Sequence, residues 1–130
     1  MGPPGRIVVL GVGNLLLSDE GAGVRCVERL AASGALPAGV VAIDGGTSTH
    51  ELLGDLEDLD LLVIIDAVAS GGAPGSLVRA PGRVVVHGVV PARIALDLAL
   101  SPEVAAVLPE LAARVVAEVT CALPGACCEA

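Results

Sequence analysis

Four side chains that can bind a metal ion lie where apolar stretches of this chain end or where the next helix is predicted to start. They are Glu20, Asp44, Asp66 and His87. Carboxylate oxygens and an imidazole nitrogen together suit a divalent transition metal. Asp66 stands out because it ends a run of five apolar residues, where a carboxylate is costly unless it lies at a rim or is paired. These positions predict a cation site built from the ends of three strands, at Asp44, Asp66 and His87, and the start of a helix, at Glu20.

Glu20 lies in a glycine-rich segment, residues 11–23, which reads Gly-Val-Gly-Asn-Leu-Leu-Leu-Ser-Asp-Glu-Gly-Ala-Gly. Glycine lets a backbone turn sharply and be approached closely. Asp19 and Glu20 then fall at the start of a predicted helix, where unpaired N–H groups and the helix dipole stabilise negative charge. For Asp19 we expect only this helix-start role, which is also the plain alternative for Glu20. Two ionised carboxylates suit a cation and would repel a phosphate.

The spacing of apolar residues predicts strands that alternate with helices. The predicted strands cover residues 6–10, 40–44, 61–66, 76–79 and 84–87, and the predicted helices cover 19–33, 48–56 and a long segment that starts at Ser101. This alternation predicts a single α/β domain over residues 1–120, with a mostly parallel sheet of about five strands and helices on both faces. Residues 121–130 are predicted to form a loose tail. Ligands of such sheets bind beyond the carboxyl ends of the strands, where the four side chains lie.

The composition disfavours several kinds of partner. Seven basic residues, all arginine, stand against fifteen acidic ones, and the net charge of −8 opposes nucleic acid as a partner. No apolar run is long enough to span a membrane, and Asp19 and Glu20 stand where a signal peptide would need small residues. None of the four cysteines forms a Cys-x-x-Cys pair, which favours reduced thiols and a cytoplasmic location. We expect no tightly bound organic cofactor.

A nucleotide-binding module of flavodoxin-like fold is a competing interpretation. Gly11 and Gly13 form half of a dinucleotide-binding fingerprint, but Leu16 stands where the third glycine belongs. The two acids that follow would repel a pyrophosphate, which disfavours this interpretation.

The chain resembles the hydrogenase maturation endopeptidases in several segments that follow one another in the family's order. These segments are residues 10–20, 44–47 with 51–54, 62–67 with 73–75, 88–91 and 101–104. The resemblance implies an endopeptidase that removes the C-terminal tail from the precursor of a nickel-containing hydrogenase large subunit after metal insertion. The nickel would arrive with this substrate, and the family's two metal-contacting carboxylates match Glu20 and Asp66.

Five residues, of which Asp44 is already named above, are predicted to bind the substrate. They are Asn14, Asp44, Gly45, Gly46 and Thr47. Asn14 belongs to the first similar segment, and the other four form the second. Asp44 has an equally good alternative role, because an aspartate before a glycine often forms a turn.

One part of the family pattern is missing. Relatives carry a metal-contacting histidine on a helix between the last two strands, whereas here Ala80, Pro81 and Gly82 alone separate the two predicted strands. A crossover that contains a helix needs roughly ten residues or more. One hypothesis is that His87 replaces the lost ligand, and a separate one is that the chain is a relative that binds the precursor without cutting it. The plainer interpretation of His87 is a core or rim histidine with a partner inside the protein.

Overall fold

The computed structural model describes residues 7–46, 59–82 and 84–123. Its elements are β1 (Ile7–Val12), a 3₁₀ turn η1 (Ser18–Gly21), α1 (Ala22–Ser33), β2 (Val40–Gly46), β3 (Leu61–Ala67), β4 (Leu77–Ala80), β5 (Val84–Val89) and α2 (Pro102–Ala122). The strands form one sheet in the order β2-β1-β3-β5-β4, in which β4 runs antiparallel to β5 and the other neighbours are parallel. The predicted single α/β domain with a mostly parallel sheet is confirmed.

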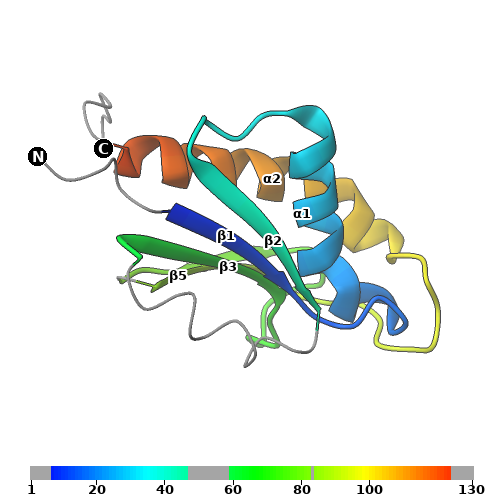
Figure 1. Cartoon of the computed structure of the whole chain (residues 1–130). Helices are drawn as coiled ribbons and strands as arrows, with labels where there is room; N and C mark the ends of the chain where they lie inside the picture. The colour runs from blue at the N-terminus through cyan, green and yellow to red at the C-terminus, as the bar shows by residue number, and fades with distance from the viewer. Residues whose placement is uncertain (1–6, 47–58, 83, 124–130) are drawn as a thin grey trace, which may run out of the picture.

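Both helices of the described residues lie against the same face of the sheet (Figure 1). α1 packs on β1, β2 and β3, α2 packs on β3 and β5, and the two helices touch each other. The core between helices and sheet is aliphatic, and its fully buried side chains include Val9, Ile65, Leu111 and Val115. The helix predicted over residues 48–56, which would cover the opposite face, falls outside the described residues.

The strands differ from the predicted ranges by one or two residues at their ends, and two predicted helix boundaries also differ from the structure. The helix predicted over residues 19–33 is divided, because Glu20 lies in η1 and α1 begins at Ala22. Residues 121 and 122, which were expected to belong to a loose tail, lie in α2, and residues 124–130 fall outside the described residues. The predicted start of the last helix is confirmed: Ser101 caps α2 by accepting a hydrogen bond from the Val104 N–H at 3.3 Å.

β4 and β5 form a hairpin with a short connection. β4 ends at Ala80 and β5 starts at Val84, so residues 81–83 join them and leave no room for a helix. This confirms the expectation from the sequence that no helix lies between these two strands. Within the described ranges, no helix is both long and apolar enough to cross a membrane.

Candidate functional site

The loop that carries Glu20 follows β1 and is held close to the sheet by glycines. A methyl group on Gly13 would overlap the carbonyl oxygen of Glu20, and one on Gly23 would overlap the carbonyl oxygen of Ile65. Gly13 also has a φ of 129°, which residues with a side chain rarely adopt. The start of α1 therefore sits directly on β3. As a result, η1 contacts β3 and places Glu20, partly exposed, at the carboxyl edge of the sheet.

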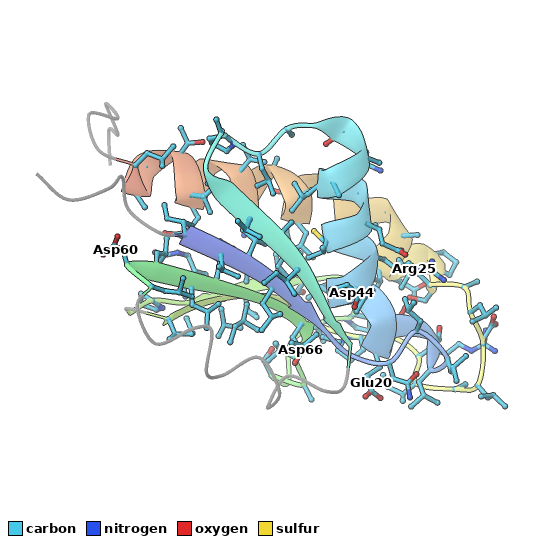
Figure 2. The ribbon with its side chains drawn as sticks, in the orientation of Figure 1. Glu20, Arg25, Asp44, Asp60 and Asp66 are labelled. Atoms are coloured by element: carbon cyan, nitrogen blue, oxygen red, sulfur yellow. The ribbon has the colours of Figure 1, made fainter. Side chains whose placement is uncertain are left out.

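Asp66 lies near the end of β3 and is partly buried. Its Oδ1 accepts a hydrogen bond from the Ala67 N–H at 2.7 Å. Burial raises the pKa of the Asp66 carboxyl, this hydrogen bond partly offsets the rise, and the negative charge of Glu20 raises the pKa further. The two carboxylates, here called the carboxylate pair, are therefore close enough to repel each other. Figure 2 shows both of them below the carboxyl ends of the central strands.

Asp44 lies at the same edge of the sheet but on its other face. Paired residues of neighbouring parallel strands point to the same face, and successive residues of a strand point to opposite faces. Asp44 is paired with Gly11, which faces α1 because a side chain there would overlap this helix. Gly11 is also paired with Ile65, the residue before Asp66. Asp44 therefore lies on the helix face, beside α1 in Figure 2, and the structure does not gather it with the carboxylate pair as predicted.

His87 also lies on the helix face, because it is paired with Ile65 of β3. The residue is 3% exposed, and its Nε2 lies 2.9 Å from Oε1 of Glu118 in α2. Arg79 Nε donates to the same oxygen at 2.7 Å, and this hydrogen bond is the main reason why the pKa of Glu118 is lowered. The three side chains border a cavity of about 320 Å³ against α2, on the opposite face from Asp66.

The prediction that His87 supplies the missing metal ligand is therefore wrong, because the fold turns the ring away from the carboxylate pair. The plainer interpretation, a core histidine with a partner in the protein, is confirmed by the contact with Glu118. Within the described part of the chain, no group of three or more histidine, cysteine, aspartate or glutamate side chains is arranged to hold a metal ion. The carboxylate pair thus stands at the carboxyl edge without a third such side chain from these residues.

The structure describes four of the five residues predicted to bind substrate. Asn14 Oδ1 accepts a hydrogen bond from the Leu16 N–H at 2.9 Å and so shapes the Glu20 loop. Gly45 is buried, and Gly46 ends β2. Thr47 falls outside the described residues. The role of this set in substrate binding stays a prediction.

Sequence reasoning missed the structural role of Asp19. Its fully buried carboxylate accepts hydrogen bonds from the N–H groups of Ala92, Arg93 and Ser101 and from the Ser101 hydroxyl, at 2.7–2.9 Å. Burial pushes the pKa of Asp19 up, but the hydrogen bonds outweigh it and the pKa is lowered. Asp19 thereby ties the Glu20 loop to the segment that leads into α2. Its partners lie 73–82 positions away, so no local pattern could reveal them.

The two cysteines that the structure describes differ in state. Cys26 is a free thiol in the core, and burial raises its pKa to about 12, which makes it unreactive at neutral pH. Cys121 is disulfide-bonded. The expectation of reduced thiols is therefore confirmed for Cys26 and wrong for Cys121.

Comparisons with known proteins agree on one family. Residues 24–82 match the family model described as hydrogenase maturation protease. Over 75 residues the chain is 55% identical to the hydrogenase expression/formation protein HupD of Rhodobacter capsulatus, and over 73 residues it is 53% identical to the hydrogenase 2 maturation protease of Escherichia coli. These matches cover 58% and 55% of this chain. They span 36% and 44% of the two relatives, less than half of their length.

Solved structures extend the likeness to the whole fold. The hydrogenase maturating endopeptidase HybD of Escherichia coli superposes with a TM-score of 0.79 and 32% identity, over 88% of this chain and 91% of that one. A hydrogenase 2 maturation peptidase from a Thaumarchaeota archaeon superposes with a TM-score of 0.78 and 28% identity, over 88% and 97%. Because a relative more than 30% identical is matched over nearly its whole length, the chain belongs to the hydrogenase maturation protease family.

Proposed function

We propose that this chain is an endopeptidase that removes the C-terminal tail of a nickel-containing hydrogenase large-subunit precursor after the nickel has been inserted. The observation that carries the proposal is the carboxylate pair, Glu20 and Asp66, which repel each other at the carboxyl edge of the family's fold. Membership of the hydrogenase maturation protease family is supported by the sequence and structure comparisons above. The substrate, the cleaved tail and the role of the nickel belong to the proposal.

The repulsion within the carboxylate pair suits it to sense a cation. Two carboxylates held close together gain more from a divalent ion than two isolated ones, because the ion's charge outweighs their repulsion. Because the pKa of Asp66 is raised, a proton competes with the ion for this carboxylate up to a higher pH than at an ordinary aspartate. Binding is therefore favoured at neutral and alkaline pH and weakened in acid.

The precursor that carries the nickel would supply its remaining ligands. Glu20 and Asp66 would then contact an ion that is already held on its other side, so that a loaded precursor is distinguished from an empty one. A divalent ion in this position can polarise a carbonyl group or activate water for hydrolysis. The predicted substrate-binding residues Asn14 and Asp44, with the glycines after Asp44, lie in the segments next to this edge. We also propose a cytoplasmic location. A reduced Cys121 thiol in cells would support this location, and a Cys121 disulfide in cells would contradict it.

A second candidate function is supported by the hairpin between β4 and β5. Its three-residue connection has no room for the family's histidine helix, and His87 faces Glu118 instead of the carboxylate pair. A relative built in this way would bind the nickel-loaded precursor and hold it without cutting it.

One experiment separates the two candidates. The purified chain is incubated with nickel-loaded precursor, and tail release is followed by mass spectrometry, with binding measured in parallel. The variants are Glu20→Gln and Asp66→Asn, and the control is Glu110→Gln, an exposed residue of α2 paired with Arg114. Tail release that both site variants abolish and the control retains supports the endopeptidase. Binding without release supports the second candidate, and neither binding nor release contradicts both.

A further inference from the structure

Exposed apolar side chains lie beside the Glu20 loop. The segment 92–99, here called the arm, passes along this loop on its way to α2 (Figure 1). Leu16 of the loop and Ile94, Leu96 and Leu98 of the arm have exposed fractions of 54%, 52%, 82% and 60%. We propose that these four side chains, the apolar patch, form the surface on which the nickel-loaded precursor docks. This inference rests on the proposed function and names the surface that its substrate contacts.

The apolar patch lies on one side of the arm. Its three arm residues occupy every second position, and the residues between them, Ala95 and Asp97, are partly buried. A parallel bridge pairs Asp97 with Leu17. The residues that precede this pair, Leu96 and Leu16, lie beside each other at this bridge, and both are exposed. The patch is thus one surface shared by the arm and the Glu20 loop.

Hydrogen bonds fix the arm against the loop. The Asp97 N–H donates to the Leu16 carbonyl at 2.9 Å, and the Asp97 carbonyl accepts from the Ser18 N–H at 2.7 Å. Ser18 Oγ donates to the Ala99 carbonyl at 2.8 Å. The buried Asp19 carboxylate accepts from Ala92 at the start of the arm and from Ser101 just beyond its end. The exposure of the leucines is therefore a property of an ordered backbone. Contiguous exposed apolar side chains on such a backbone mark an interaction surface.

Polar groups with partners border the patch. Arg93 Nη2 lies 3.3 Å from Asp97 Oδ2, and Arg25 Nη2 donates to the Leu98 carbonyl at 3.0 Å. An apolar centre with a polar, partnered rim is the usual anatomy of a protein–protein interface. The patch thus fits a protein partner better than a small ligand.

Charge favours the precursor over a second copy of this chain as that partner. Glu20 lies four residues after Leu16, so whatever covers the patch comes close to the carboxylate pair. A second copy, with its net charge of −8, would bring more negative charge to this place. A precursor that carries a divalent cation brings the opposite charge. The apolar contact would then hold the precursor while the carboxylate pair tests its metal.

The test compares two double variants. In the first, Leu96→Thr and Leu98→Thr remove the two most exposed members of the patch. In the control, Val41→Thr and Val84→Thr change residues of β2 and β5 that are 53% and 47% exposed. The probe is the purified nickel-loaded large-subunit precursor from the chain's own host. We expect the leucine variant to bind it at least about tenfold more weakly, equivalent to about 1.4 kcal/mol, and the control to stay within about twofold.

The outcomes separate this inference from the proposed function. If the unchanged chain binds the precursor and the leucine variant binds it equally well, the patch is overturned and the proposed function stands. If the unchanged chain does not bind the precursor at all, both are overturned. A control that loses as much affinity as the leucine variant also overturns the patch. Two controls show that a loss of affinity comes from docking. Both variants should unfold at the wild-type temperature, and the pKa of Asp66, measured by NMR, should be the same as in the wild type.

Discussion

Replacing Asp19 by asparagine should destabilise the whole fold, although the two side chains have the same shape. The Asp19 carboxylate accepts three hydrogen bonds on Oδ2 and one on Oδ1. Asparagine has one side-chain oxygen. The most hydrogen bonds are kept, three of the four, when this oxygen lies at the position of Oδ2. Its NH₂ group then faces the Ser101 N–H, so that two buried donors oppose each other.

The size of the loss can be worked from these bonds. A hydrogen bond to a charged acceptor contributes about 1.5–3 kcal/mol and one to a neutral acceptor about 0.5–1.5 kcal/mol, so each of the three kept bonds loses roughly 1 kcal/mol. The unsatisfied Ser101 N–H costs about 1–3 kcal/mol more. We expect the free energy of unfolding to fall by about 4–6 kcal/mol, a large part of the roughly 5–15 kcal/mol typical of a domain.

The loss should also depend on pH. Because the pKa of Asp19 is lowered in the folded chain, the stability that its ionised form contributes is fully present above the unfolded pKa of about 3.9. That contribution disappears as the pH falls through the lower, folded value. The difference in stability between the wild type and Asp19→Asn should therefore shrink below about pH 4.

The assay is urea unfolding at pH 7 and at pH 3, followed by far-ultraviolet circular dichroism. The chain has no Phe, Trp or Tyr, so intrinsic fluorescence offers no signal. Glu28→Gln is the matched control, since Glu28 forms an exposed ion pair with Arg25 at 3.2 Å and its loss should cost less than about 1 kcal/mol. An Asp19→Asn loss below about 1 kcal/mol, or a loss of equal size at both pH values, would refute the reasoning.

Three further predictions follow from the site. Asp66→Asn should raise the free energy of unfolding at pH 7, because a raised folded pKa means that ionised Asp66 destabilises the fold. Urea titrations should show that this gain vanishes below about pH 3.9, and a loss of stability at pH 7 would contradict the prediction. Glu20→Gln should lower the pKa of Asp66, read from its carboxyl carbon by NMR, and an unmoved pKa would mean that the two charges do not interact. Gly23→Ala should cost about 3 kcal/mol in the same unfolding assay, because its methyl group meets the Ile65 carbonyl. The control Gly72→Ala, whose methyl group meets only ordinary contacts, should cost less than about 1 kcal/mol. Equal costs would count against the close approach of α1 to β3.

The sequence was sufficient to predict the strands, the sheet and the edge at which Glu20 and Asp66 lie. Strand ends can be located because an unbroken apolar run stops where burial stops, as it does at Asp66. The face to which an end residue points is harder to predict, because it depends on register. Asp44 and His87 point to the helix face because they pair with Gly11 and Ile65, and a shift by one residue would have reversed both.

The role of Asp19 could not be predicted for a different physical reason. Its neighbours in sequence offer only a helix start, whereas its hydrogen-bond donors lie in the segment before α2. A fully buried carboxylate of this kind is recognisable only once both segments have been brought together by the fold. The apolar patch was missed for the same reason, since Leu16 and Leu96 are brought together only by the bridge between the Glu20 loop and the arm.

The central claim is that Glu20 and Asp66 together contact the nickel of the precursor. The most direct measurement is nickel X-ray absorption spectroscopy of the loaded precursor, alone and in complex with this chain. The account predicts that complex formation adds oxygen ligands to the nickel, and that these ligands are absent when the chain carries Glu20→Gln and Asp66→Asn. A nickel coordination sphere that is the same in the free precursor and in the complex would contradict the account.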